Sequence, residues 1–179
     1  MEFGILIKII KEKIMKFIKK IYEIFDTKNY NWLKSEGSQS SATFEIKDNQ
    51  YYVCFDEIYT NVYNHYFYLK KEDKMIFSLM NYKSGESFKI LSNVKHIIDD
   101  FLNRNPYIEF IGFSSFDNER NDLYVMYMQY IQGENLKGAI IKEGERKRRY
   151  YFIYNENIEK LLLNKYIEEF IKKDKRLKK

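Results

Sequence analysis

The sequence is short of the residue types that cross-link or break a chain: among 179 residues it has one cysteine, one proline and seven glycines. The single thiol, Cys54, excludes an internal disulfide and suits a reducing compartment. So little proline and glycine argues against a fibrous or loop-rich protein. A glycine-rich phosphate loop and a dinucleotide fingerprint are missing as well. We therefore expect neither a disulfide framework nor a bound cofactor.

Long apolar runs are also missing. A membrane-spanning helix needs about 18 or more consecutive apolar residues, and no such run occurs. The N-terminal stretch MEFGILIKIIKEKIMKF lacks the long apolar region and the small-residue cleavage site of a signal peptide. The sequence therefore predicts a cytoplasmic protein.

What the sequence does contain is enough apolar material for a core. Hydrophobic residues make up 45% of the chain, and the length fits one domain. The net charge of +5 is unevenly placed: residues 1–20 carry +4, residues 142–149 carry +3, residues 172–179 carry +5, and the rest carry −7. This distribution predicts at most a local basic patch, formed only if the three segments converge.

The first 27 residues have the pattern of an amphipathic basic helix. Apolar side chains recur at helical spacing over residues 5–25, and lysines fill the other faces. Three interpretations of this helix stay open. It can pack on its own domain, dock into a groove of a protein partner, or lie on a membrane surface. A polar stretch at 35–42 follows and is predicted to be a loop.

The pattern then changes to short segments rich in aromatic and β-branched residues, which predict antiparallel strands at 42–47, 50–58, 65–71 and 75–82. The residues KDNQ, 47–50, predict a tight turn around Asp48 and Asn49. Residues 56–64 are expected to be a longer break. Together these segments form a meander.

Helical spacing returns over 84–105 and ends before the proline of NRNP. Further helices are predicted at 118–132 and 157–173, and strands at 107–113 and 149–154, whereas 133–148 shows no clear pattern. In the last helix the apolar residues expected to face inward are Ile158, Leu161, Leu162, Ile167, Phe170 and Ile171.

This order predicts an α+β fold, with an antiparallel meander and additional strands in one sheet and helices packed on a face. The domain organisation expected is an N-terminal basic helix at 1–27, a single α+β domain at 28–172 and a basic tail at 173–179.

A charged cluster, Asp117-Asn118-Glu119-Arg120, precedes the periodic residues of the helix at 118–132. Asp117 or Asn118 suits the N-cap position, and Glu119 suits the positive end of the helix dipole. The alternative is a general acid/base pair, but no second group elsewhere completes one. The cluster is therefore predicted to begin a helix.

Two short patterns carry a resemblance. One is II-x-x-F-L in the helix after the meander, and the other is R-x-x-L-Y in the next helix. The residues concerned are Ile97, Ile98, Phe101, Leu102, Arg120, Leu123 and Tyr124. Over about residues 42–154 the chain resembles a group of small uncharacterised phage and mobile-element proteins. That resemblance implies the α+β fold and a phage-linked origin, and it implies no activity.

The residues that most often carry catalysis do not assemble into a set. Cys54 lies among aromatic residues with no histidine nearby, so it is predicted to be buried and inert. His65 is expected at the surface, where a strand begins. His96 and Asp100, four residues apart on a helix, fit an ion pair better than a metal site. No catalytic, cofactor-binding or metal-binding residue is predicted.

A metal-dependent nuclease is the weakest alternative. Glu45-Ile46-Lys47 has the acid-x-lysine spacing of that chemistry, which needs a further acid to hold Mg²⁺. The only upstream candidate, Asp26, falls at the end of a helix rather than on a strand.

A basic and aromatic segment is the strongest candidate for binding. Its residues are Lys142, Arg146, Lys147, Arg148, Arg149, Tyr150 and Tyr151. A segment that mixes arginine, lysine and tyrosine can contact single-stranded RNA or DNA, with affinity that falls as salt rises. The same segment can also be a solvated loop before a core strand.

The function expected from the sequence is therefore contact rather than bond-making. We expect a non-enzymatic binding protein of phage or mobile-element origin, acting on a protein partner as an inhibitor of a host defence nuclease in the manner of an anti-CRISPR protein. Nucleic-acid binding through residues 142–151 is the alternative. The oligomeric state is not predicted.

Overall fold

The computed structural model of the chain describes residues 30–34, 38–72, 74–76, 86–115, 121–132, 136–144 and 148–176. The predicted N-terminal helix, the cluster 117–120 and the segment 77–85 lie outside these ranges. Everything below concerns the described residues.

The described chain forms one mixed sheet with three helices, which confirms the predicted α+β class. The strands are β1 (Tyr30–Lys34), β2 (Gln39–Ile46), β3 (Asn49–Tyr59), β4 (Val62–Lys71), β5 (Lys74–Ile76), β6 (Phe110–Ser115), β7 (Gly138–Glu143) and β8 (Arg149–Tyr154). Their order across the sheet is β1-β2-β3-β4-β6-β8-β7, and β5 pairs with β4. All pairs are antiparallel except β4 with β6.

The meander turns differ from the prediction in register and length. Ile46 pairs with Asn49, so the β2–β3 turn consists of Lys47 and Asp48, whose φ angles are 49° and 61°. Two consecutive positive φ angles give the twist that a two-residue hairpin needs. The long break expected at 56–64 is wrong, because Asn61 takes a positive φ of 64° and permits a tight turn directly between β3 and β4.

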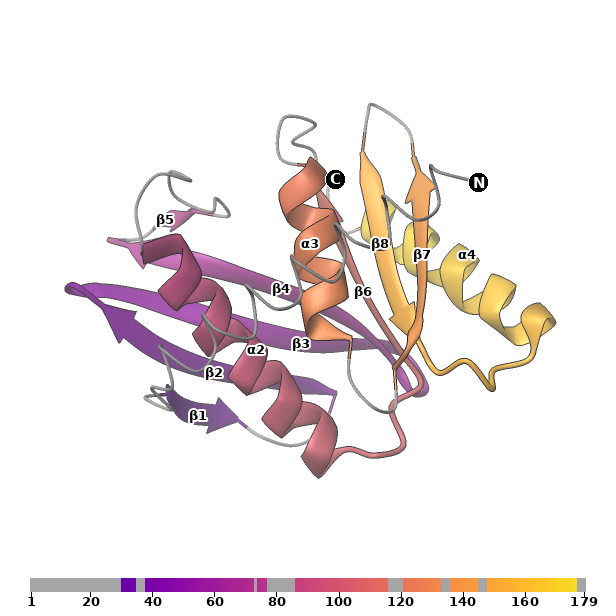
Figure 1. Cartoon of the computed structure of the whole chain (residues 1–179), viewed down its shortest axis with the longest axis horizontal. Helices are drawn as coiled ribbons and strands as arrows, with labels where there is room; N and C mark the ends of the chain where they lie inside the picture. Colours follow the sequence, from indigo (N-terminus) through magenta and orange to yellow (C-terminus); the bar gives the residue numbers. More distant parts are fainter. Residues whose placement is uncertain are drawn as a thin grey trace, which may run out of the picture.

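The helices are α2 (Glu86–Arg104), α3 (Asn121–Ile131) and α4 (Lys160–Arg176). α2 and α3 lie side by side on one face of the sheet, and α4 lies behind β8 and β7 on the other face (Figure 1). The helices are thus divided between two faces. α4 also continues to Arg176, into the segment predicted to be a tail, because Phe170 and Ile171 still pack on the second core.

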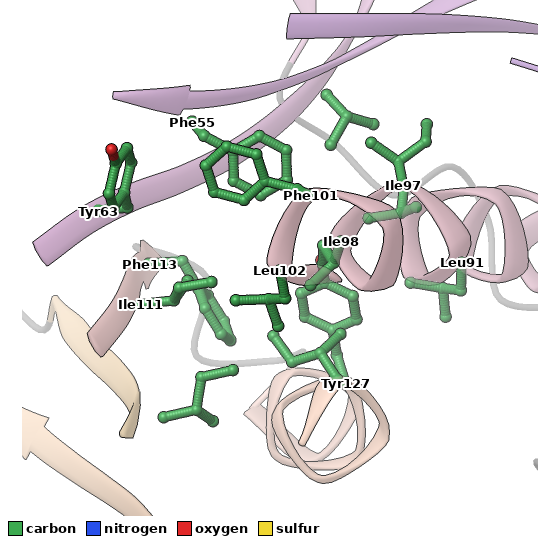
Figure 2. Packing of buried hydrophobic residues seen from close by; sticks show 14 of the residues in the cluster. Phe55, Tyr63, Leu91, Ile97, Ile98, Phe101, Leu102, Ile111, Phe113 and Tyr127 are labelled. Carbon is green, nitrogen blue, oxygen red and sulfur yellow. The ribbon is translucent and has the colours of Figure 1, made fainter. Parts of the chain in front are cut away.

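Two separate cores follow from this division. The first, under α2 and α3, contains most of the inward residues of the meander, and Phe101 stacks on Phe55 with ring centroids 3.9 Å apart (Figure 2). The second, under α4, is built from Val62, Phe110, Tyr150, Phe152, Leu163, Tyr166, Ile167 and Phe170. Alternation along each strand sends successive side chains to opposite cores, so both faces carry apolar side chains where a helix covers them.

Gly112 fixes how closely α4 approaches the sheet. A Cβ at this position would lie 2.5 Å from a ring carbon of Phe170 and 2.8 Å from one of Phe152. The absence of a side chain therefore lets the two aromatic rings rest directly on the β6 backbone.

Candidate functional site

The parallel pair β4–β6 is hydrogen-bonded over only a short distance. Its register covers residues 62–64 of β4 and 110–112 of β6, although β4 continues to Lys71 and β6 to Ser115. β6, β8 and β7 stand at a steep angle to β1–β4 (Figure 1), so the two strands diverge beyond Gly112. β3 occupies the other edge of β4, and β5 takes the facing edge only from Leu69 onward.

The divergence leaves a gap in the sheet. Among the described strands, none pairs with β4 at residues 65–68 on this edge, and none pairs with β6 at residues 113–115 on the edge facing β4. A pocket with a cavity volume of about 80 Å³ lies here. It is lined by His65, Tyr66, Phe67, Phe113, Ser114, Tyr124 and Tyr127. We call it the β4–β6 slot.

Both sides of the sheet contribute to the slot. His65 and Phe67 follow Tyr63 on the first-core face of β4, whereas Tyr66 points to the opposite face. On β6, Phe113 belongs to the first core and Ser114 points the other way. The slot is therefore lined between the two strands and not on one surface of the sheet. Tyr124 and Tyr127 of α3 line it on the first-core side.

A buried hydrogen bond joins two of these residues. His65 Nε2 lies 2.5 Å from the Tyr127 hydroxyl oxygen, and the side chains are 1% and 2% exposed. Figure 2 shows Tyr127 on α3, beside Leu102 and Ile98 of α2. The pair lies in otherwise aromatic surroundings.

Uncharged rings surround His65. Its ring centroid is 5.2 Å from that of Phe55, 6.4 Å from Phe67, 6.5 Å from Phe113 and 6.0 Å from Tyr127. Burial lowers the pKa of His65 from 6.5 to about 4, because the charged imidazolium would lose its hydration. The ring is therefore neutral at pH 7.

The face of β3 and β4 opposite the first core carries a polar cluster beside the slot. The Tyr66 hydroxyl hydrogen-bonds to both Asp56 and Cys54. Burial raises the pKa of Cys54 to about 11, so the thiolate is scarce near neutrality. The predicted buried thiol agrees with this placement, and Cys54 is 8% exposed. Burial also raises the pKa values of Asp56 and Tyr66.

The basic segment is divided by its folding into β7 and β8. Tyr150 and Tyr151 are 1% and 0% exposed, one in each core, so neither ring is open to a nucleic-acid base. Arg148 is 5% exposed, and its guanidinium lies over the Tyr150 ring at 5.8 Å. Arg146 and Lys147 lie outside the described residues. Lys142 is exposed on β7, and Arg149 bonds to Glu143 across the hairpin.

The residues considered for a metal site or a nuclease site do not form a cluster in the described structure. Glu45 is exposed on β2, Lys47 is in the adjoining turn, and Asp26 lies outside the described residues. The carboxylate of Asp100 accepts hydrogen bonds from Tyr30 and Trp32 and pairs with Arg104. In the described part of the chain no three His, Cys, Asp or Glu side chains cluster as metal ligands would.

Sequence reasoning placed His65 at the surface, and this prediction is wrong. The signal that could have found it is the alternation Tyr63, His65, Phe67 and Leu69, which sets the histidine in a row of core residues. Tyr127 carried no comparable signal. The helix-capping role expected of Asp117 or Asn118 falls outside the described residues, and α3 begins at Asn121.

No family model matches the chain, and neither does any curated protein. The phage resemblance thus stays a prediction. Among solved structures, the chain is similar to the spermidine/spermine N-acetyltransferase SpeG from Vibrio cholerae. A mutant form is 13% identical with a TM-score of 0.40, covering 66% of this chain and 67% of that one. The manganese complex is 13% identical with a TM-score of 0.41, covering 66% and 65%.

A chimera of SpeG and hSSAT is 14% identical with a TM-score of 0.39, covering 73% of this chain and 70% of that one. At these values the similarity assigns no activity. The proteins named are enzymes, however, and this finding goes against the expected non-enzymatic inhibitor and nucleic-acid binder, so neither is carried further. In the described ranges, none of the helices has both the length and the apolar character needed to cross a bilayer.

Proposed function

We propose that this protein is an acyltransferase that binds the pantetheine arm of a coenzyme A thioester in the β4–β6 slot. The observation that carries the proposal is the gap between two parallel strands whose facing edges are not paired by any described strand beyond residues 64 and 112.

Hydrogen bonding along the strand edge favours a ligand that carries amides. The backbone N–H and C=O groups along this edge need partners when a ligand displaces water from them. An extended ligand that carries amides at peptide-like spacing can bond to a strand edge as an added strand does. The slot is therefore suited to an amide-containing chain.

The small volume of the slot favours a slender ligand. A peptide strand would place a side chain above or below the slot at every residue, whereas the cavity volume is only about 80 Å³ and its lining is aromatic. The pantetheine arm has two amides separated by methylene groups and ends in a slender thioester. It satisfies the strand edge without requiring space for side chains.

Acyl transfer from a thioester also needs a group that moves a proton. An acyl group moves when the acceptor attacks the thioester carbon, the carbon–sulfur bond breaks and the departing sulfur takes up a proton. Tyr127 is the slot residue with a buried hydroxyl whose position is fixed by a hydrogen bond. A positioned acid or base of this kind contributes about 10²–10⁴-fold in rate.

Binding is tested by titrating the full chain with acetyl-coenzyme A, and separately with pantetheine, in a calorimeter. We expect a dissociation constant below about 1 mM for acetyl-coenzyme A and competition by pantetheine for the same site. Activity is tested by release of free thiol in the presence of a panel of primary amines that includes spermidine. Absence of binding by both ligands would overturn the proposal.

A substitution in the slot gives the sharper comparison. Ser114→Trp fills the gap between the strands and is expected to weaken acetyl-coenzyme A binding by about tenfold or more. Ser38→Trp makes the same change at an exposed position before β2 and serves as the matched control. Equal affinities in the two variants would place the ligand elsewhere.

A further inference from the structure

β7 is the last strand of the sheet on the side away from β1 (Figure 1), and no described strand pairs with its outer edge. An open edge presents backbone N–H and C=O groups that can pair with another strand. β1, at the opposite end, has a register shift between Trp32 and Lys34, an irregularity that discourages such pairing. The register of β7 with β8 is regular throughout, so β7 is the edge suited to a partner strand.

The hairpin decides which residues of β7 direct their backbone groups outward. Gly144 N donates to Arg148 O at 2.8 Å, so these two residues form a hydrogen-bonded pair of the ladder. Hydrogen-bonded and non-hydrogen-bonded pairs alternate along an antiparallel ladder. The even-numbered residues of β7 therefore bond to β8, whereas Ala139, Ile141 and Glu143 direct their N–H and C=O groups to the outer edge.

The three outward residues are symmetric about Ile141. Two antiparallel copies of β7, related by a two-fold axis perpendicular to the sheet, can therefore place Ile141 opposite Ile141 and Ala139 opposite Glu143, which pairs all the outward groups. A register shifted toward residue 137 is less suited, because the Lys137 carbonyl accepts a hydrogen bond from the Gln132 side chain. The symmetry of the edge thus favours a second copy as the partner, and one register.

The side chains agree with this register. Ile141 is 41% exposed in the single chain, and at the axis it would pack on Ile141 of the second copy. Glu143 would have Lys137 of the second copy as its diagonal neighbour, and both charged side chains are exposed. Diagonal neighbours lie about 7–8 Å apart, within reach of long side chains. Opposite charges are therefore brought together, and no like charges lie directly opposite each other.

We propose that the protein forms a homodimer in which the β7 strands of two copies pair antiparallel about Ile141 and join the two sheets into one. This pairing goes beyond the proposed acyltransferase activity and does not depend on it. The three hydrogen-bonded residue pairs supply about six backbone hydrogen bonds. Because the contact is small, we expect a dissociation constant of about 10–100 μM.

Association is measured by sedimentation velocity of the full chain between about 1 and 200 μM, where the wild type should show a monomer–dimer equilibrium. Ile141→Lys places like charges opposite each other at the axis and should raise the dissociation constant by about tenfold or more. Leu33→Lys, the same change at a 61% exposed position on β1, should leave it unchanged. A wild-type chain that stays monomeric at every concentration would overturn the proposal, as would equal weakening by the two substitutions.

Cross-linking tests the register. The two copies of residue 141 form a hydrogen-bonded pair with Cα atoms about 5.5 Å apart, a separation that a disulfide spans. Ile141→Cys should therefore give a disulfide-linked dimer with oxidised glutathione. Lys142→Cys is the matched control, because residue 142 lies opposite residue 140 and the two Cα atoms at 142 are more than about 7 Å apart.

The native thiol does not complicate this comparison, because Cys54 is 8% exposed and is present in both variants. A linked dimer from Ile141→Cys alone supports pairing about Ile141. Linked dimers from both variants, or from neither, would rule out that register.

Discussion

The two faces of the sheet are packed by the same kinds of residue but serve different ends. The second core, under α4, is a continuous aromatic contact in which Phe110, Phe152 and Phe170 meet one another and the polar bond of Tyr166 to Glu109 is at the margin. The first core holds a histidine and a tyrosine hydroxyl at its centre, next to the gap between β4 and β6.

The two cores differ because only the first contains a buried histidine. Burying a histidine costs stability, since the ring must stay neutral and its polar atoms need partners. A face that serves only for packing has no reason to carry that cost. If the proposed acyltransferase activity is correct, the first core carries the chemistry and the second core contributes stability alone.

The largest loss of stability in the second core is expected from Phe170→Ala. Phe170 is 1% exposed and its ring meets that of Phe152 edge to face at a centroid distance of 5.2 Å. Removing it should lower the free energy of unfolding by about 3–5 kcal/mol, measured by urea denaturation. Leu161→Ala, on the same helix at 82% exposure, should change it by less than about 0.5 kcal/mol. Similar losses in both would mean that α4 does not pack as described.

Acid should destabilise the first core through His65. Its pKa is about 6.5 in the unfolded chain and about 4 in the folded one, so between these values only the unfolded chain binds the proton. The free energy of unfolding therefore falls as pH drops from 6.5 to 4, by about 3 kcal/mol in all, and this contribution is constant above pH 6.5.

The measurement is urea denaturation at pH 7 and pH 4.5 for the wild type and for His65→Gln. The variant should lose about 2 kcal/mol less stability between the two pH values than the wild type does. Tyr166→Phe, which alters only the other face, should keep the wild-type pH dependence. An identical pH dependence in His65→Gln would show that the histidine is not buried in the neutral form.

Gly112→Ala should destabilise the second core by disturbing the packing of α4 on β6. The added methyl would meet ring carbons of Phe170 and Phe152 closer than any ordinary contact, so the helix must shift. We expect a loss of about 1–3 kcal/mol in the free energy of unfolding. Ser114→Ala on the same strand is the control, and a neutral result for Gly112→Ala would mean that α4 stands farther from β6.

The smallest effect is expected from Tyr166→Phe. Its hydroxyl donates to Glu109 Oε2 at 3.0 Å, and burial raises the pKa of Tyr166 to about 12. Loss of this bond should cost about 1 kcal/mol, because Glu109 is only half-buried and water can replace the donor. Thermal unfolding measures this loss, and an unchanged midpoint in Tyr166→Phe would mean that the bond to Glu109 does not stabilise the fold.

Much of the fold followed from periodicity. The helix at 84–105 was predicted within two residues at its start and one at its end, because Leu91, Val94, Ile98 and Phe101 repeat at helical spacing and all are buried. β8 was predicted at its observed bounds. The failures have local causes. Leu161 was predicted to face inward and is exposed, because Leu163 and Tyr166 take the contacts with the second core instead.

The candidate site was not predicted, and the reason lies in its construction. His65 and Tyr127 are 62 positions apart, and neither has a neighbour in sequence that completes a catalytic pattern. The gap between β4 and β6 depends on how far two strands stay paired, which the residue types along them do not encode. The basic segment 142–151 was the opposite case: its pattern was visible, but strand alternation put its tyrosines in the two cores.

The sequence by itself determined the α+β class, the number of main helices among the described residues and the burial of Cys54, because these follow from local spacing and from the cost of exposing apolar side chains. Only the tertiary structure decided that helices occupy both faces, that β4 and β6 part after three paired positions, and that a histidine meets a tyrosine beside the resulting gap. Local patterns fix which way a side chain points, but the partner it meets is set by strands and helices that are distant in the chain.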